Sequence, residues 1–208
     1  MKTVLLFIIS FVLCYLFGSF NASIFISKSM YKDDIRKKGS GNAGATNMLR
    51  VNGKKAAILT FACDILKTII AEAIVVLLFK NSEYQKLALG FGGLMIVLGH
   101  CYPVFFNFKG GKGIVVGGVL TLFVDLRVGA VVWGVFVIIL IISKIVSLSS
   151  IMACVSYPIS LFAFPSDYQY KGLLILSSVL VAGFIIVKHS ANIKRIINGK
   201  ESKISFKK

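Results

Sequence analysis

Acidic residues are scarce in this sequence. Its 208 residues include 8 Asp and Glu against 24 Lys and Arg, which gives a formal net charge of +16. A basic chain can bind nucleic acid, but here the charges form short clusters between long apolar runs. Because the aromatic side chains lie inside those runs, lipid or core packing explains them, and we expect no nucleic-acid partner.

Cysteine is too sparse and too scattered for a metal centre or a disulfide framework. No two cysteines form a C-x-x-C pair, and they are far apart at Cys14, Cys63, Cys101 and Cys154. Such cysteines usually behave as small buried apolar residues. We therefore expect no metal site and no cofactor.

Long polar stretches are also missing. Hydrophobic residues make up 57% of the chain, and the mean hydropathy is +0.86. Because a soluble domain needs far fewer apolar residues, residues 1–208 are predicted to form a single all-α integral membrane domain. The N-terminal apolar run is longer than a signal peptide and lacks an A-x-A-like cleavage site, so we expect it to be retained as a spanning helix.

Seven apolar segments approach the length of about 20 residues that spans a bilayer. They are Val4–Ile26, Ala56–Phe79, Leu87–Gly99, Ile114–Phe123, Val128–Ile142, Ile145–Phe164 and Leu173–Lys188. Pro158 interrupts one of them, which membrane helices tolerate. The prediction is a compact bundle of about seven transmembrane helices, or five if the two shortest runs are not full spans.

The distribution of basic residues predicts how this bundle is oriented. With seven spans, eighteen Lys and Arg fall on the side of the C-terminal tail and five on the side of the N-terminus. Cytoplasmic loops are enriched in Lys and Arg. We therefore expect the N-terminus outside, the C-terminus in the cytoplasm, and all glycine-rich basic loops together on the cytoplasmic face of the membrane.

The first of these loops, "KKGSGNAGATNMLR", contains the spacing G-x-G-x-x-G. A dinucleotide-binding turn needs a buried strand before it, and the residues 33–38 are "DDIRKK", so that interpretation fails. Glycine-rich backbone can still bind an anion, Arg50 can grip a phosphate with two hydrogen bonds, and a helix that starts near Ala43 would add its dipole. The alternative is a flexible loop that touches lipid headgroups.

The second loop, "GHCYPVFFNFKGGKG", ends in two lysines interleaved with three glycines. It is not a P-loop, because no glycine stands five residues before Gly111 and Gly113 follows Lys112 where Ser or Thr is required. The pattern nevertheless suits a doubly charged phosphate monoester. Membrane anchoring remains the alternative for Lys109 and Lys112, and a helix-end histidine is the alternative for His100.

The third segment, "KHSANIKRIINGKE", places His189, Asn192 and Arg195 on one side of a helix, although an amphipathic tail on anionic lipid is the alternative. Two smaller features add candidates. Asp64 and Lys67 can pair inside the second span and brace the loops. Ser143 and Lys144 form a turn that offers further phosphate contacts or simple anchoring.

These segments resemble the three motifs of one family, the bacterial acyl-phosphate:glycerol-3-phosphate acyltransferases, or PlsY family. The motifs are G-S-G-N-x-G-A-T-N-x-x-R, G-H-x-x-P-x-x-x-x-F-K-G-G-K-G and H-x-x-N-I-x-R-x-x-x-G-x-E, in that order. Departures are Lys144 where arginine is common, Ser190 where a basic residue is frequent, and Thr68 in place of a glycine.

The resemblance implies a reaction and a site. A fatty acyl group would pass from acyl phosphate to the 1-hydroxyl of glycerol 3-phosphate, giving lysophosphatidic acid and inorganic phosphate without acyl-CoA or acyl carrier protein, at a bacterial cytoplasmic membrane. Functional coupling to the enzyme that produces acyl phosphate is implied as well. Phosphate-binding residues carried over from the motifs are Ser40, Gly41, Asn42, Gly44, Thr46, Asn47, Arg50, Lys109, Gly110, Gly111, Lys112, Gly113, Ser143, Lys144, His189, Asn192 and Arg195.

Within this site we predict distinct roles. Arg50 and Lys112 are phosphate clamps, His100 or His189 is the base unless a substrate phosphate takes the proton, and Asp64, Lys67 and Glu201 give structural support. An organic-phosphate transporter would need more polar residues near the membrane midplane than Glu72. A non-catalytic lipid-binding scaffold would leave the three motifs unexplained.

Overall fold

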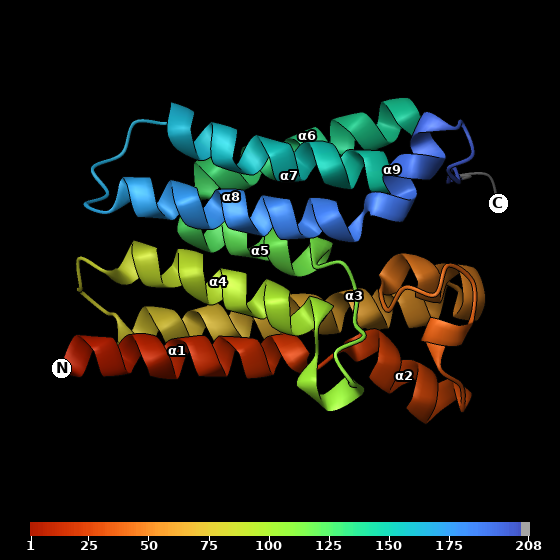
Figure 1. Cartoon of the computed structure of the whole chain (residues 1–208), viewed down its shortest axis with the longest axis horizontal. Coiled ribbons are helices and arrows are strands. Elements are labelled where there is room, and N and C mark those ends of the chain that lie inside the picture. Colours follow the sequence, from red (N-terminus) through yellow and green to blue (C-terminus); the bar gives the residue numbers. More distant parts are fainter. Residues whose placement is uncertain (205–208) are drawn as a thin grey trace.

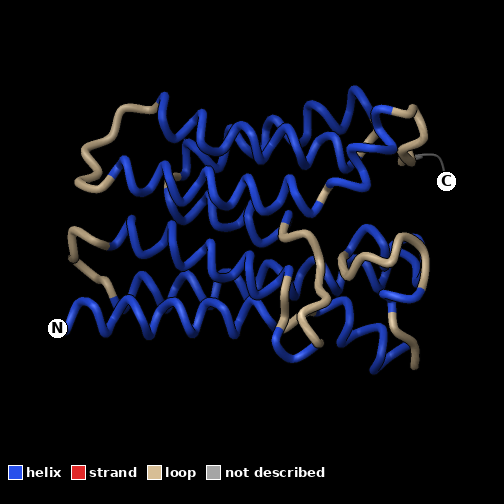
Figure 2. Tube along the Cα trace, in the orientation of Figure 1, coloured by secondary structure: helices blue, strands red, loops and turns tan. Residues whose placement is uncertain are grey.

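The computed structural model of the chain describes residues 1–204; Lys207 and Lys208, counted above among the inner charges, lie outside them. The described residues form α-helices, two 3-10 turns and no strand (Figure 2). The helices are α1 (Lys2–Ser19), α2 (Ala22–Tyr31), α3 (Ala45–Leu78), α4 (Gln85–Cys101), α5 (Ile114–Val124), α6 (Leu126–Ser143), α7 (Val146–Ala163), α8 (Lys171–Lys188) and α9 (Ser190–Ile197), and the 3-10 turns are η1 (Ile35–Lys37) and η2 (Val104–Phe106).

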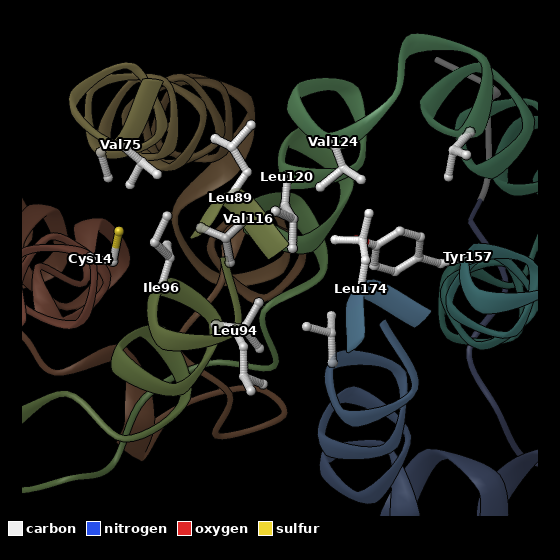
Figure 3. Packing of buried hydrophobic residues seen from close by; sticks show 14 of the residues in the cluster. Cys14, Val75, Leu89, Leu94, Ile96, Val116, Leu120, Val124, Tyr157 and Leu174 are labelled. Atoms are coloured by element: carbon white, nitrogen blue, oxygen red, sulfur yellow. The ribbon is translucent and has the colours of Figure 1, made fainter. Parts of the chain in front are cut away.

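The long helices run roughly parallel to one another in a single bundle (Figure 1). Helix α4 lies at its centre and packs against α1, α3, α5 and α8, while α7 packs between α6 and α8. Apolar side chains from these helices form one continuous core, seen in Figure 3, which includes Cys14, Val75, Ile96, Leu120 and Leu174. The outer surface of α6 is apolar as well, as a lipid-facing helix requires.

The first predicted span is not one continuous helix. Helix α1 ends at Ser19, and α2 starts again at Ala22 in a different direction (Figure 1). The Asn21 side chain accepts a hydrogen bond from the N–H of Ile24 at 3.2 Å and so caps α2. Lys67 Nζ donates to the carbonyls of Gly18 and Phe20, at 3.3 and 2.9 Å. These polar contacts end α1 despite the uninterrupted hydropathy. The predicted Val4–Ile26 segment is therefore divided between two helices, although Lys2–Tyr31 as a whole has the length and composition of a span.

Five segments have the length and the composition of a membrane span. They are Lys2–Tyr31, Gln85–Phe106, Leu126–Ser143, Val146–Ala163 and Lys171–Lys188. Helix α5 is apolar but short, with 11 residues, and α3 carries more charge. Both occupy places in the bundle where the sequence predicts a span; the count of seven stays a prediction.

Helix α3 consists of two helical parts joined at Gly53. This glycine has φ 84° and ψ −176°, a backbone conformation that is essentially restricted to glycine. The short part before it, residues 45–52, carries part of the first motif. The long part after it, residues 54–78, crosses the bundle, so Gly53 sets the angle between the two.

The two ends of the bundle carry different segments of the chain. Figure 1 shows the N-terminus at one end, together with the connections α3–α4 and α7–α8, and shows α2, α9 and the last described residues at the other. The three motifs all reach this second end. Which end faces the cytoplasm stays a prediction from the charge distribution.

Candidate active site

A cavity of about 260 Å³ opens among the three motifs and continues between the helices. All three motifs contribute to its lining, with Ser40, Asn42, Gly44, Thr46, Asn47, Arg50, His100, Lys112, Gly113, His189, Asn192 and Glu201, and Asp64 adds a carboxylate from α3. The rest of its lining comes mainly from α5, α6, α7 and α8 and is largely apolar, although it includes Thr121, Ser147 and Ser150. The volume is near the lower limit of roughly 300–1,000 Å³ for small-molecule pockets.

The glycine-rich loop before α3 is held in shape by Asn47. This residue is 1% exposed, and its Oδ1 accepts from the N–H of Ser40 at 2.9 Å. Its Nδ2 donates to the carbonyls of Ile35 and Lys38 at 3.2 and 3.0 Å. Because both the oxygen and the nitrogen of the amide form hydrogen bonds within the protein, Asn47 positions the loop. Ser40 and Asn42 of this loop line the cavity.

The N-terminus of α3 also lines the cavity. No side chain caps this helix at Gly44, and the first turn of a helix leaves N–H groups without intrahelical partners. Thr46 and Arg50 project from the same short segment into the lining. Among the described residues, no side chain forms an ion pair with Arg50. The segment therefore offers a positive dipole, a hydroxyl and a free guanidinium to one ligand.

The glycines of the second loop let it close on the end of α4. The N–H of Gly110 donates to the carbonyl of Cys101 at 3.2 Å, and that of Gly111 to the carbonyl of His100 at 3.0 Å. A Cβ on Gly111 would lie 2.2 Å from Nε2 of His100. Gly110 and Gly111 were predicted to bind phosphate, but their N–H groups are occupied by these hydrogen bonds within the protein.

A hydrogen-bonded network connects Lys112 to Glu201. Its ammonium donates to the amide oxygen of Asn192. The amide nitrogen of Asn192 donates to Glu201 Oε1 at 2.7 Å, and Ser147 donates to the same oxygen at 2.8 Å. Arg195 Nε donates to Glu201 Oε2 at 2.6 Å. Glu201 therefore joins α7, α9 and the second loop, and its structural role stays a prediction.

The electrostatics of this network affect both its cation and its anion. Burial lowers the pKa of Lys112 to about 8, with Arg195, Arg50 and Lys188 adding to the effect against the attraction of Glu201. Burial alone would raise the pKa of Glu201, but its hydrogen bonds from Arg195, Asn192 and Ser147 hold it below the usual value. At neutral pH Lys112 is charged and close to titration, and Glu201 is ionised.

The two histidines have different proton arrangements. Nδ1 of His189 lies 2.8 Å from the carbonyl of Ile185, and a carbonyl can only accept, so this nitrogen carries the proton. Burial, which outweighs that bond, and the nearby Lys112 lower the pKa of His189 to about 4, so the ring is neutral at pH 7. Its Nε2 is then left as an acceptor in the cavity lining.

His100 is arranged the other way round. Its Nδ1 lies 3.0 Å from Lys67 Nζ, and an ammonium can only donate. The remaining nitrogen, Nε2, then carries the proton next to Gly111. His100 can therefore only donate from Nε2, whereas His189 keeps an acceptor nitrogen.

Asp64 and Lys67 form the predicted ion pair inside the bundle. Asp64 Oδ1 lies 2.8 Å from Lys67 Nζ, and both side chains are buried. Lys67 also binds the end of α1 and the ring of His100. The pair thus connects the break in the first span to the second motif.

Some predicted site residues do not line the cavity. They are Gly41, Lys109, Gly110, Gly111, Ser143, Lys144, Arg195 and Lys67. The Ser143 hydroxyl donates to the carbonyl of Ile139 at 2.7 Å and accepts from the N–H of Ile145 at 3.1 Å, so it shapes the α6–α7 turn. Ser147, Trp133 and Tyr157 also line the cavity. Their place could not be predicted, since neither a lone serine nor an aromatic residue in an apolar run has a diagnostic spacing.

A family model described as glycerol-3-phosphate acyltransferase matches residues 8–199. The chain is 41% identical over 193 residues to a glycerol-3-phosphate acyltransferase of Finegoldia magna, which covers 93% of each chain. It is 37% identical to a protein of the same name from Syntrophomonas wolfei, over 94% of this chain and 96% of the relative.

The chain belongs to the glycerol-3-phosphate acyltransferase family. A crystal structure of PlsY (YgiH), described as an integral membrane glycerol 3-phosphate acyltransferase in its glycerol 3-phosphate form, has a TM-score of 0.84 and 36% identity over 96% of both chains. The lysophosphatidic acid form has a TM-score of 0.81 and 35% identity, over 96% of this chain and 95% of the other. Members of the glycerol-3-phosphate acyltransferase family are acyltransferases, so this protein is an integral membrane enzyme, and the resemblance seen in its motifs is confirmed.

Proposed function

We propose that this acyltransferase moves a fatty acyl group from acyl phosphate to the 1-hydroxyl of sn-glycerol 3-phosphate. The products are lysophosphatidic acid and inorganic phosphate. The observation that carries the proposal is a single cavity with a cationic, donor-rich mouth and an apolar interior between helices. The same site therefore offers hydrogen-bond donors for phosphate beside an apolar surface for an acyl chain, and the names of the relatives support glycerol 3-phosphate as the acceptor.

The mouth suits phosphate because its donors are of several kinds. Arg50 supplies a planar fork and Lys112 an ammonium, while Ser40, Asn42 and Thr46 supply uncharged donors. We assign Arg50 and Lys112 as the clamps on the two phosphates. Gly41 and Gly44, together with the turn from Gly110 to Gly113, shape the backbone around them. Direct phosphate contacts of Lys109, Ser143 and Lys144 remain predictions.

The reaction forms one bond and breaks one. The 1-hydroxyl oxygen attacks the acyl carbonyl carbon, the carbon–oxygen bond to phosphate breaks, and phosphate leaves with the electron pair. Since acyl phosphate is already activated, no covalent enzyme nucleophile is needed. Catalysis then rests on orientation of the two substrates and on stabilisation of the developing negative charge.

The hydroxyl proton goes to a nearby base. Of the two histidines, His189 is the better candidate, because its Nε2 is free to accept while His100 presents a donor. His100 would instead donate to the oxyanion or to a phosphate oxygen. A substrate phosphate remains the alternative base. Normal turnover in a His100→Ala, His189→Ala double variant would remove histidine from this step.

The membrane arrangement follows the charge distribution. We propose one domain over residues 1–208, with the N-terminus outside and the site open to the cytoplasm of a bacterial cell. The acyl chain enters from the inner leaflet, and the enzyme that makes acyl phosphate is a functional partner. Cysteine labelling of Lys2→Cys and Lys200→Cys variants from each side of oriented vesicles tests this arrangement.

One experiment tests the reaction itself. Purified protein in liposomes is given palmitoyl phosphate and labelled glycerol 3-phosphate, with acyl-CoA and acyl carrier protein donors in parallel reactions. Labelled lysophosphatidic acid from palmitoyl phosphate alone is the expected result. Product formed only from a thioester donor would overturn the donor assignment, and uptake of label without product would indicate a transporter.

A further inference from the structure

Asp64 is a carboxylate in a cavity whose cations suit an anionic ligand. It lies in the long part of α3, is 2% exposed, and lines the cavity together with Arg50 and Lys112. An ionised carboxylate has no proton to donate and offers a ligand only acceptor oxygens. Because it also repels phosphate, a direct role of Asp64 concerns a part of the ligand that donates a hydrogen bond.

The ion pair with Lys67 does not use the hydrogen-bonding capacity of Asp64. Lys67 Nζ lies 2.8 Å from Oδ1, yet Oδ1 has no hydrogen-bond partner among the described residues. An ammonium has three protons, and those of Lys67 have three other acceptors: the carbonyls of Gly18 and Phe20 and Nδ1 of His100. Lys67 therefore neutralises the charge of Asp64 by proximity, without a hydrogen bond to it.

Neighbouring side chains of α3 supply no donor to this carboxylate either. The Thr68 hydroxyl donates to the backbone carbonyl of Asp64 at 2.8 Å, and the Thr60 hydroxyl donates to the carbonyl of Ala56 at 2.8 Å. Oδ1 is enclosed, so Oδ2 is the oxygen through which Asp64 can meet a ligand, and within residues 1–204 no hydrogen bond to it is formed. A buried acceptor of this kind is costly unless a ligand or a water molecule supplies a donor.

The other carboxylate that lines the cavity, Glu201, has no free acceptor of this kind. Its Oε1 accepts from Asn192 and Ser147, and its Oε2 accepts from Arg195. In the described part of the chain, Asp64 is therefore the lining carboxylate with an oxygen left for a ligand.

Glycerol 3-phosphate has two hydroxyl groups, and each donates one hydrogen bond. The proton of the 1-hydroxyl goes to the base, which is assigned above to His189 or a substrate phosphate. The 2-hydroxyl still needs an acceptor, since a polar group that loses water without a new partner weakens binding. We propose that the carboxylate of Asp64 accepts the hydrogen bond of the 2-hydroxyl, so that the enzyme selects glycerol 3-phosphate over phosphates that carry a single hydroxyl. This inference rests on the proposed function, which makes glycerol 3-phosphate the acceptor.

The test compares two acceptors, glycerol 3-phosphate and 3-hydroxypropyl phosphate, which lacks only the 2-hydroxyl. Each is given with palmitoyl phosphate to the purified enzyme, and the quantity measured is the ratio of the two kcat/KM values. The wild type is expected to favour glycerol 3-phosphate by at least about tenfold, the effect of one hydrogen bond to a charged group. In Asp64→Ala the ratio should approach unity, because neither acceptor then meets a carboxylate.

Glu72→Gln is the matched control for a second variant, Asp64→Asn. Both replace a buried carboxyl of α3 with an amide of similar size, but Glu72 does not line the cavity. Asp64→Asn should lower the ratio severalfold, because a neutral hydrogen bond is weaker than a charge-assisted one, whereas Glu72→Gln should keep the wild-type ratio. A purely structural role of Asp64 would lower kcat/KM for both acceptors equally and leave the ratio unchanged.

The outcomes are distinct. A wild-type ratio near unity would overturn the inference, and so would an unchanged ratio in active Asp64→Ala. If Asp64→Ala cannot be purified folded, Asp64→Asn decides in its place, and an unchanged ratio there overturns the inference as well. Failure of the proposed function looks different, because the wild type would then form no acylated product from glycerol 3-phosphate and palmitoyl phosphate.

Discussion

Two ionisable side chains, Lys112 and Glu72, are partly or fully buried, and burial disfavours their charged forms. Lys112 is charged inside a site shared with three other cations, and its amide partner Asn192 is itself fixed by Glu201. Glu72 lies in the long part of α3 with 0% exposure. Among the described residues neither of its oxygens has a hydrogen-bond partner. Hydrogen bonds stabilise the ammonium of Lys112, and a bound phosphate would complete them. The carboxyl of Glu72 has no such partner among the described residues.

The pKa of Lys112 predicts a pH dependence. In the free enzyme the ammonium is lost above a pKa of about 8, so kcat/KM for glycerol 3-phosphate should fall roughly tenfold per pH unit above that value. A bound phosphate dianion favours the ammonium, so kcat should decline only at higher pH. Steady-state kinetics from about pH 6 to about pH 10, roughly two units on either side of the pKa of Lys112, measure both profiles.

A matched variant checks that Lys112 causes this decline. Lys112→Arg keeps the charge at every working pH, so its kcat/KM should be lower but lose the alkaline decline. An unchanged alkaline limb in this variant would show that another group titrates.

Stability should respond to pH in the opposite direction to activity. Because the pKa of Lys112 is lower in the folded protein than in the unfolded chain, the free energy of unfolding should rise between about pH 8 and the ordinary lysine pKa of about 10.4.

Glu72 predicts a stabilising substitution. Replacing it with methionine, of similar length, removes two unpaired buried oxygens, each group of this kind costing roughly 1–3 kcal/mol. The thermal midpoint of Glu72→Met in detergent should therefore increase by several degrees while acyl transfer continues. A loss of turnover without a loss of folding would instead give this carboxyl a functional role.

At the scale of elements, helix ends are held by lysines from neighbouring segments. Lys67 binds the last carbonyls of α1. Lys86 donates to the carbonyls of Phe123 and Val124 at the end of α5, at 3.2 and 2.6 Å. Lys171 donates to the carbonyl of Phe164, directly after α7, at 2.8 Å. A cation at the negative end of a helix dipole is favourable, so these lysines do more than anchor the chain at a membrane surface.

The junction within α3 predicts a large effect from a very small substitution. Gly53→Ala meets no atom within 4 Å of the new Cβ, so any effect comes from its backbone conformation, which costs roughly 1–3 kcal/mol for other residues. We expect a lower thermal midpoint and a higher KM for glycerol 3-phosphate, because the segment bearing Arg50 changes direction. Both quantities are measured on the purified enzyme.

Gly134→Ala is the control for this change. Gly134 lies within α6, also has open space at its Cβ position, and has no positive φ. There alanine should be neutral or stabilise by up to about 1 kcal/mol. Equal effects at both positions would contradict the assignment of Gly53 as the element that sets the angle.

At the scale of the whole molecule, the site is assembled from sequence-distant segments. Glu201 closes it, so Glu201→Ala should leave Asn192 and Arg195 without their anion and reduce kcat/KM at least about tenfold, since hydrogen bonds to charged groups contribute roughly 1.5–3 kcal/mol. Lys200→Ala, at an exposed neighbour, should have little effect. Equal activity in both variants would show that the network does not position Lys112.

Much of this arrangement could be predicted from the sequence, because hydropathy gives apolar segments and charge places the loops at one end. The convergence of Arg50, Lys112 and His189 followed from motifs whose chemistry is complementary to phosphate. The break at Asn21 could not be predicted, since it depends on Lys67 from another helix. Likewise, the hydrogen bonds of Gly110 and Gly111 to the end of α4 depend on tertiary contact, which no local pattern records.

The network through Glu201 has a consequence for biosynthesis. Chains are made from the N-terminus, so the loop with Ser40 and Arg50 is made long before Glu201. Until the last segment is released, Asn192 and Arg195 lack their partner, and Lys112 is not held in place. We therefore expect a chain that stops before Glu201 to insert into the membrane without acyltransferase activity.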